Sequence, residues 1–246
     1  MKEGFRPKAN KATYGTFSKI MVFIRLILDL QLLTIIRDAK RVLPGLKGKI
    51  LDVGCGDSPY QALLNSQNTA YTGIDIADAN TFDYLNSAVI PFDGRHIPFG
   101  SNVFNGIICT EVLEHVEEYQ LLIGEMHRVL VNGGIAFITI PWSARYHYIP
   151  YDYFRYTPSS LKTMFSCFSQ VSIKPRGSDI AVIANKLIVL WFRNLLPASR
   201  WKYIFVPFWI AMSPVLGAAV AGAHISLWLN LGSADDPLGY TIECVK

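Results

Sequence analysis

The stretch Leu51-Asp52-Val53-Gly54-Cys55-Gly56-Asp57-Ser58-Pro59 decides the fold of this chain. An apolar strand at residues 49–53 runs into a Gly-x-Gly turn, and a helical segment is expected at residues 60–64. Glycine has no Cβ and tolerates positive φ, so the backbone of such a turn can approach a nucleotide closely. Pro59 stands where a dinucleotide fingerprint would place its third glycine. The turn therefore predicts a nucleotide-like ligand without specifying which one.

The composition indicates one large domain, or one domain with an appendage, and its charge is uneven. The 246 residues carry a net charge of +4, but residues 1–49 hold eleven Lys and Arg against three acids. This local excess lies beside an apolar segment, residues 17–36, and favours contact with an anionic surface, a membrane or nucleic acid. The alternative is a solvated basic tail.

The cysteines and the start of the chain predict a cytoplasmic location. Cys55, Cys109, Cys167 and Cys244 have no CxxC or Cys/His spacing, so they indicate reduced thiols and no zinc site. No metal is expected. The first sixteen residues are polar and basic, without the apolar stretch of a signal peptide.

Strand-like and helix-like segments alternate from Lys49 onward, which is typical of a parallel sheet covered by helices on both faces. The sequence thus predicts an α/β fold. Strands are expected at residues 49–53, 70–74, 88–92, 103–109, 134–140, 171–174 and 240–245.

Acidic residues follow two of these strands. Asp75 ends the second strand, nineteen residues past Gly56, where a carboxylate can accept hydrogen bonds from both ribose hydroxyls. Asp93 follows the third strand and could accept a hydrogen bond from an adenine amine. The alternatives are a helix cap for Asp75 and a turn for Asp93.

The order of several motifs resembles that of class I S-adenosylmethionine-dependent methyltransferases. The resemblance covers residues 48–175. Within the class, this region is similar to the small-molecule enzymes that carry a Glu-Val-Leu-Glu-His-Val segment. The motifs are Leu51–Pro59, Gly73–Ile76, Ile97–Phe99, Glu111–Val116 and Arg128–Gly134.

This resemblance implies a Rossmann-like sheet of seven strands in the order 3-2-1-4-5-7-6, with strand 7 antiparallel. It also implies S-adenosylmethionine as the cofactor. Two departures are the missing third glycine and Asn105, where the family usually has Asp. The implied contacts are Asp52, Gly54, Cys55 and Gly56 with the methionine part, Asp75 with the ribose, Ile76 and Asp93 with the adenine, and Thr110, Glu111 and His115 around the methyl-transfer pocket.

The loop after the fifth strand is the expected acceptor site, because α/β folds bind substrates at the carboxyl edge of the sheet. His147 and His115 are the candidate catalytic residues, since an imidazole can take a hydroxyl proton near neutral pH. The alternative is a packed aromatic lid with a structural ion pair. The segment 151–158 is similar to methyltransferases associated with bacterial surface-glycan synthesis. The candidate substrate contacts are Trp142, Tyr148, Tyr151, Asp152 and Arg155.

An apolar insert separates the sixth and seventh strands. Residues 203–234 contain no Asp, Glu, Lys or Arg, a run longer than the roughly 20 residues that span a bilayer. Both strands belong to one sheet, so the insert must begin and end on the same side of any membrane. A two-helix hairpin or a segment lying in the interface is expected, giving peripheral or monotopic membrane attachment. The alternative is a soluble cap.

These features divide the chain into an N-terminal helical segment (1–47), a methyltransferase domain (48–179 with 236–246) and the insert (180–235). The expected function is O-methylation of a small-molecule, glycan or lipid-linked acceptor. The alternatives are a non-catalytic cofactor-binding or scaffold protein and an NAD-dependent oxidoreductase. Pro59 and the antiparallel last strand disfavour the oxidoreductase, and nucleic-acid methylation is disfavoured because no Asn-Pro-Pro-Tyr-type pocket is present.

Overall fold

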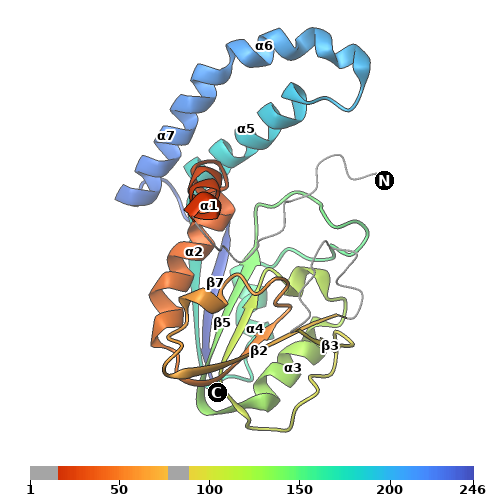
Figure 1. Cartoon of the computed structure of the whole chain (residues 1–246), viewed down its shortest axis with the longest axis vertical. Helices are drawn as coiled ribbons and strands as arrows, with labels where there is room; N and C mark the ends of the chain where they lie inside the picture. Colours follow the sequence, from red (N-terminus) through yellow and green to blue (C-terminus); the bar gives the residue numbers. More distant parts are fainter. Residues whose placement is uncertain (1–15, 77–88) are drawn as a thin grey trace.

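A seven-stranded sheet forms the centre of the computed structural model, which describes residues 16–76 and 89–246 (Figure 1). Its strand order is β3-β2-β1-β4-β5-β7-β6. β1 to β5 are parallel, and β7 runs antiparallel to both β5 and β6. The predicted fold class and strand order are therefore confirmed. The strands are β1 Gly48–Val53, β2 Thr69–Ile76, β3 Ile90–Phe92, β4 Phe104–Thr110, β5 Leu130–Pro141, β6 Gln170–Arg176 and β7 Gly239–Val245.

Helices cover both faces of this sheet, as predicted. α2 (Leu30–Val42) lies on one face, whereas α3 (Tyr119–Val129) and α4 (Pro158–Met164) lie on the other. Successive residues of β4 show the two faces, because Ile107 packs in the cluster that contains α3 and Ile108 in the cluster that contains α2.

The prediction of a helical segment at residues 60–64, directly after the glycine turn, is wrong in extent. The structure has only a short 3₁₀ turn there, η2 (Gln61–Leu63), and Leu64 is already extended with a ψ of 149°. The stretch is too short to propagate a helix. Asn65 also starts the next turn, because its side chain accepts a hydrogen bond from the Gln67 amide at 3.1 Å.

The N-terminal apolar segment forms two helices. α1 (Thr16–Leu28) is followed by Asp29, whose side chain caps α2 by accepting a hydrogen bond from the Leu32 amide at 3.1 Å. Arg25 donates to the same carboxylate at 3.0 Å. The basic residues among positions 1–15 and the expected strand residue 88 lie outside the described residues.

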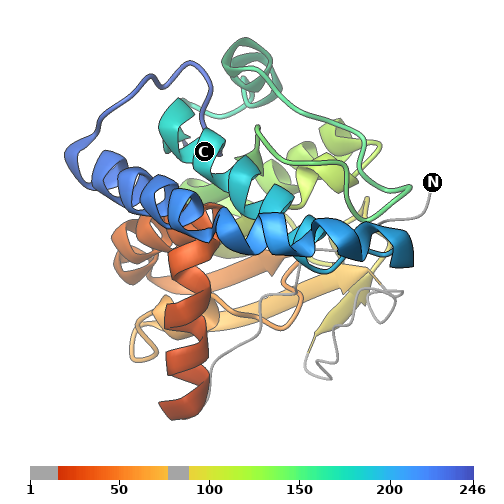
Figure 2. The same ribbon diagram turned by 90° about the horizontal axis from the view of Figure 1, so that it is seen from above.

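The insert between β6 and β7 is helical: α5 (Asp179–Leu195), η5 (Arg200–Phe205), α6 (Val206–Ala211) and α7 (Ser213–Leu229). α5 and α7 lie side by side at one end of the molecule, close to α1 (Figures 1 and 2). Ala184 and Ala223 are buried between them, together with Leu30 of α2. The apolar insert is thus partly covered by the N-terminal helices.

The insert leaves and re-enters the sheet at its carboxyl edge. Gly239 pairs with Pro141, the last residue of β5, and with Arg176, the last residue of β6. Two contacts tie neighbouring segments to this edge: Gln31 donates to the Leu238 carbonyl at 2.9 Å, and Lys186 donates to the Ser143 carbonyl at 3.3 Å.

Within the described residues, no single helix combines the length and apolar character needed to cross a bilayer. Only when taken together do α5 and the helical segment Arg200–Ala211 reach that length and apolar character, and the two are bent by 116° relative to each other.

Candidate functional site

The glycine turn after β1 is tight and leaves no room for side chains at its first glycine. Gly54 and Gly56 have positive φ angles of 70° and 50°. A Cβ on Gly54 would lie 2.5 Å from Cγ2 of Val112. The amides of Gly54 and Cys55 both donate to the Ile74 carbonyl, at 2.9 and 3.1 Å. The turn therefore presents bare backbone at the carboxyl edge of β1, as a nucleotide-like ligand requires.

Asp75 closes this turn from the end of β2. One carboxylate oxygen accepts from the Gly56 amide at 2.7 Å, and the other accepts from the Ile76 amide at 2.8 Å. Burial raises the pKa of Asp75, although these two amides oppose the rise. Ile76 beside it is 37% exposed, so its side chain is accessible to a ligand at the end of β2. The ribose role of Asp75 and the adenine contact of Ile76 stay predictions.

Asp52 lies in the centre of the sheet with one oxygen unsatisfied. Its Oδ2 accepts from the Tyr71 hydroxyl at 2.7 Å, whereas Oδ1 is buried and has no hydrogen-bond partner among the described residues. Burial raises the pKa of Asp52 to about 7, with the Tyr71 hydroxyl opposing the rise and the charge of Asp75 adding to it. A buried carboxylate oxygen needs a donor, and the ammonium group of an amino-acid ligand would supply one.

Cys55 is a packing residue of the turn, not a reactive thiol. Its side chain is buried, and burial followed by the charge of Asp52 raises the pKa of the thiol. Its Sγ would meet a Cβ on Gly73 at 2.7 Å, so the thiol fills the space beside β2. Cys55 contributes shape to the predicted cofactor site.

Asp93 has the turn role that the sequence analysis gave as its alternative. It accepts hydrogen bonds from the amides of Arg95 and His96 at 2.7 and 2.6 Å, and it lies 2.9 Å from His96 Nδ1. These bonds to His96 and Arg95 hold the pKa of Asp93 below its usual range. A Cβ on Gly94 would lie 3.5 Å from Ile76, so this turn borders the predicted adenine position. The adenine contact of Asp93 stays a prediction.

Glu111 has a partner that the sequence did not reveal. It follows Thr110, the last residue of β4, and has a φ of 53°, a rare value for a non-glycine residue that is typical of functional sites. Its Oε1 accepts from Arg176 at 2.7 Å. The side chain of Arg176 is fully buried and also contacts Thr34 Oγ1 at 3.3 Å and the Ile140 carbonyl at 3.3 Å. Arg176 thus joins β6 and α2 to the predicted methyl-transfer pocket.

The acceptor loop contains the ion pair expected as an alternative. Arg155 donates to both oxygens of Asp152, at 2.6 and 2.8 Å, and Asp152 also accepts from the His147 amide at 3.0 Å. Burial would raise the pKa of Asp152, but the hydrogen bonds from His147 and Arg155 hold it below its usual range. With 1% of its side chain exposed, Asp152 orders the loop from within.

The two candidate catalytic histidines lie together. The ring centroids of His115 and His147 are 5.0 Å apart, and the Tyr148 ring lies 5.4 and 5.2 Å from them. Burial lowers the pKa of His115 to about 4, so its imidazole is neutral near pH 7. Glu114 beside it is fully buried, and burial followed by the charge of Glu111 raises the pKa of Glu114 well above its usual value.

The remaining loop aromatics do not share one location. Tyr151 is 53% exposed, whereas Trp142 donates from Nε1 to Asp236 at 3.0 Å and packs near Tyr240. The structure therefore brings His115, His147, Tyr148 and the Asp152–Arg155 pair into one cluster and places Trp142 against the segment that follows α7.

The sheet order, the glycine turn and the acid at the end of β2 define a class I S-adenosylmethionine-dependent methyltransferase fold. A family comparison agrees with this class, because residues 51–138 match the model of a methyltransferase domain. The chain thus contains a methyltransferase domain whose class uses S-adenosylmethionine.

Sequence relatives and a solved structure are moderately similar to this chain. An uncharacterised protein of Methanocaldococcus jannaschii is 33% identical over 91 residues, 37% of this chain and 40% of that protein. Ubiquinone biosynthesis O-methyltransferase of Pseudomonas paraeruginosa is 32% identical over 106 residues, 39% of this chain and 45% of the enzyme. The matches thus span less than half of these curated relatives. A solved S-adenosylmethionine-dependent methyltransferase from Archaeoglobus fulgidus superimposes with a TM-score of 0.54 at 16% identity, covering 92% of this chain and 99% of that one, which shows the fold.

Proposed function

We propose that this protein transfers a methyl group from S-adenosylmethionine to a hydroxyl of a lipid-linked or other small acceptor at a membrane surface. One observation carries the proposal: the apolar insert adjoins the carboxyl edge of the sheet, the same edge that holds the glycine turn and the acceptor loop. An acceptor anchored in a membrane would thus meet the cofactor pocket where the protein itself contacts lipid.

The residues at the glycine turn fit the cofactor. Gly54 and Gly56 leave backbone free for the amino-acid part. Oδ1 of Asp52, which has no hydrogen-bond partner in the described part of the chain, suits the ammonium group of that part. Asp75 suits the ribose hydroxyls and the exposed Ile76 suits the adenine face. The bound cofactor supplies an activated methyl group, so the protein needs chiefly to align an acceptor and remove its proton.

His115 and His147 are the candidate proton acceptors, with His115 a weak base because burial lowers its pKa to about 4. Their Nδ1 atoms lie 2.6 Å from the Tyr151 carbonyl and 2.9 Å from the Arg145 carbonyl, which favours hydrogen on Nδ1 and a free lone pair on Nε2. Tyr148 against both rings and the Asp152–Arg155 pair would hold this arrangement in place. The name of the Pseudomonas relative supports an oxygen as the methylated atom.

The exposed apolar surface supports membrane contact. Large apolar side chains of α1 and the insert project into solvent, more than a soluble surface usually carries in one region. α7 has no charged residue, yet much of it is exposed. Arg193 in the last turn of α5, and Arg200 and Lys202 in η5, suit anionic headgroups. The most exposed apolar residues are Phe23, Ile183, Leu196, Trp201, Ile204, Phe208 and Trp228.

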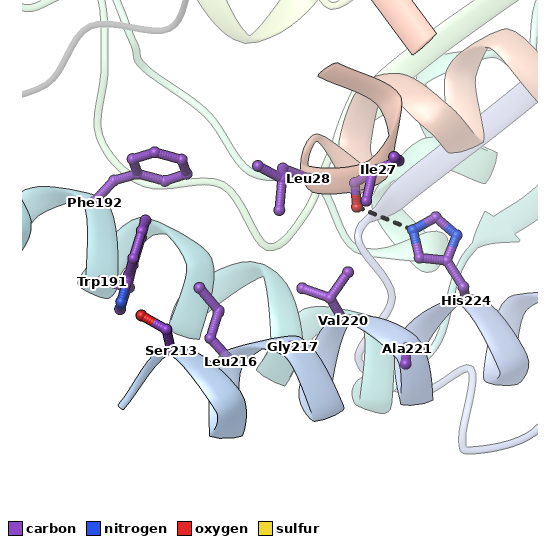
Figure 3. Close-up of a pocket in the computed structure, with 10 residues that line it drawn as sticks. All are labelled: Ile27, Leu28, Trp191, Phe192, Ser213, Leu216, Gly217, Val220, Ala221 and His224. Atoms are coloured by element: carbon purple, nitrogen blue, oxygen red, sulfur yellow. Dashed lines mark hydrogen bonds between the residues drawn. The ribbon is translucent and has the colours of Figure 1, made fainter. Parts of the chain in front are cut away.

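A pocket between α1, α5 and α7 supports a lipid-linked acceptor. Its volume is about 560 Å³, within the range of small-molecule sites, and its walls are almost wholly apolar (Figure 3). His224 closes one end by hydrogen bonding to the Ile27 carbonyl at 3.0 Å. The lining residues are Ile27, Leu28, Trp191, Phe192, Ser213, Leu216, Gly217, Val220, Ala221 and His224.

Calorimetry with S-adenosylmethionine and with NADH tests the cofactor. The full chain should bind the former and not the latter, and Asp75→Ala should weaken binding at least tenfold. Incorporation of radiolabelled methyl into lipid extracts and water-soluble glycan extracts of cell envelopes tests transfer and locates the acceptor. Binding without incorporation into any extract would favour the non-catalytic alternative, and no binding of S-adenosylmethionine would overturn the proposal.

Flotation with anionic liposomes tests the membrane contact. The wild-type chain should float, whereas Ile204→Ser combined with Phe208→Ser should leave most protein at the bottom. Ile135→Ser is the matched control, because Ile135 is an exposed apolar residue of β5 away from the insert. Equal flotation of all three chains would contradict a membrane role for the insert.

A further inference from the structure

Glu114, His115 and His147 form a compact group of metal-binding side chains. Glu114 and His115 belong to the 3₁₀ turn η4 (Leu113–His115) after β4, and His147 comes from the loop after β5. One carboxylate oxygen and one nitrogen from each ring lie within 4.8 Å of one another. The separation of His115 Nε2 and Glu114 Oε1 is 3.6 Å. The sequence did not predict this group because its members come from two distant segments.

The Nδ1 atom of each imidazole faces hydrogen-bond acceptors. His115 Nδ1 lies 2.6 Å from the Tyr151 carbonyl. His147 Nδ1 lies 2.9 Å from the Arg145 carbonyl and 3.1 Å from Asp152 Oδ2. A carbonyl oxygen only accepts hydrogen bonds, so each Nδ1 carries the hydrogen and each Nε2 keeps a lone pair. Metal-bound histidines nearly always donate their other ring hydrogen to such a carbonyl or carboxylate.

Glu114 supplies an independent sign that a ligand is missing. Its side chain is fully buried, and neither carboxylate oxygen has a hydrogen-bond partner among the described residues. Arg155 nearby donates to both oxygens of Asp152 and, within the described residues, makes no hydrogen bond to the Glu114 carboxylate. Buried carboxylates are normally paired, hydrogen-bonded or bound to a metal.

We propose that Glu114, His115 and His147 bind a divalent transition-metal ion. Two imidazoles and one carboxylate suit Mn²⁺, Fe²⁺, Co²⁺ or Zn²⁺ better than Mg²⁺ or Ca²⁺, which prefer oxygen ligands. Ligand distances of about 2.0–2.2 Å would require the three side chains to close by roughly an ångström.

Three protein ligands leave positions open for a water molecule or an acceptor oxygen. With the ion bound, the two imidazoles would serve as its ligands in place of the proton-acceptor role proposed for them. The ion would lower the pKa of a bound acceptor hydroxyl, whose proton would pass to water. This role in catalysis rests on the proposed function, whereas the binding of the ion does not.

Cobalt titration of the untagged, chelator-treated full chain tests the site. We expect one Co²⁺ to bind per chain and to give visible absorption bands typical of nitrogen and oxygen ligands. Zn²⁺ should displace the Co²⁺, and calorimetry monitors this displacement. Mg²⁺ at the same concentration should not displace Co²⁺. Because S-adenosylmethionine is absent from the titration, failure of the methyltransferase assignment would leave this result unchanged.

Three variants decide which side chains bind. Glu114→Gln, which keeps the shape of the side chain, and His147→Gln should each weaken Co²⁺ binding at least tenfold. His127→Gln is the matched control and should leave the affinity unchanged. His127 lies on α3, outside the group, where its ring packs against Phe168. Thermal unfolding checks that each variant is folded. The proposal is overturned by absence of binding, by unaltered affinity in folded Glu114→Gln, or by a thiolate-to-cobalt charge-transfer band, which would assign the ion to a cysteine.

Discussion

Asp52 has to ionise in a place that disfavours its charge, and this should make the stability of the protein depend on pH. Burial raises the pKa of this carboxyl to about 7 in the folded chain, whereas in the unfolded chain it titrates near its usual value of 3.8. A group with a raised folded pKa stabilises the protein below the unfolded pKa, and this contribution is lost as the pH rises through the folded pKa. Each pKa unit corresponds to about 1.4 kcal/mol.

We therefore predict that Asp52→Asn becomes more stable relative to the wild type as the pH rises from 5 to 8. The amide carries no charge, so it escapes the cost of a buried carboxylate near Asp75. Thermal unfolding of both chains across this range, without cofactor, measures the difference. Asp93→Asn is the flat control, because the pKa of Asp93 is held below its usual range and its contribution to stability therefore stays constant between pH 5 and 8. A constant difference for Asp52→Asn would contradict the prediction.

Replacing Arg176 should lower the stability of the protein, because this buried side chain connects three acceptors around the site. Its buried guanidinium donates to Glu111, Thr34 and the Ile140 carbonyl, so Arg176→Met should leave all three acceptors without this donor. Breaking a buried ion pair by removing one partner costs about 3–5 kcal/mol, and partial exposure of Glu111 favours the lower end. Urea unfolding measures this loss.

A double-mutant cycle separates the pair from the packing of Arg176. Adding Glu111→Gln to Arg176→Met should restore part of the stability, because no uncompensated charge remains. Strict additivity of the two single changes would show that the 2.7 Å contact contributes little to folding.

At the scale of helices and strands, periodicity and motif order predicted the sheet but not everything that surrounds the site. The strands were predictable because each is an apolar run bounded by turn residues, and the family resemblance supplied their order. The helix at residues 60–64 failed because a stretch of five residues cannot outweigh the turn at Asn65. The break between α1 and α2 also depends on one side chain, the cap at Asp29.

Site residues whose partners lie far away in the sequence were missed, because a local sequence pattern does not reveal long-range contacts. Asp75 follows its strand directly, so its proximity to the glycine turn could be inferred from topology. Arg176 and Glu111 lie 65 residues apart, and a lone arginine at the end of the sixth strand gives no signal of its partner. The grouping of Glu114 with His147 likewise depends on how the acceptor loop folds back, which no local pattern encodes.

The pocket between α1, α5 and α7 leads to a prediction about the insert as an element. Gly217 lines the pocket, and a Cβ there would meet no atom of the described residues within 4 Å, so Gly217→Leu should fill the space without disturbing the helix. It should reduce binding of a fluorescent alkyl-chain probe at least tenfold. Replacing glycine within a helix should also favour the helix by up to about 1 kcal/mol.

Gly222→Leu is the matched control for this experiment. Gly222 lies on the same helix, also has open space around its Cβ position, and does not line the pocket. Equal probe binding by both variants would mean that the probe does not occupy the pocket. Calorimetry with S-adenosylmethionine should give the same affinity for both, since neither residue lies near the glycine turn.

At the scale of the whole molecule, the arrangement of the sheet constrains how the protein can meet a membrane. β6 and β7 are neighbours in one sheet, so the insert must start and finish on the side of the methyltransferase domain. α1 lies at the same end of the molecule as the insert (Figure 1), and its exposed Phe23 adds to the apolar surface. A membrane reached by this end would lie next to the carboxyl edge of the sheet, where the acceptor loop begins after β5.

This orientation predicts which tryptophans enter lipid. Trp228 on α7 is 79% exposed, whereas Trp142 at the acceptor loop is tied to Asp236 by its indole N–H. Brominated lipids in anionic liposomes should quench much of the wild-type fluorescence, and Trp228→Phe should remove a large part of the quenchable emission. Trp142→Phe should leave the quenchable emission unchanged, because the acceptor loop opens beside the interface and not inside the acyl chains. Equal loss from both variants would contradict this orientation, since it would put the acceptor loop as deep in lipid as the insert.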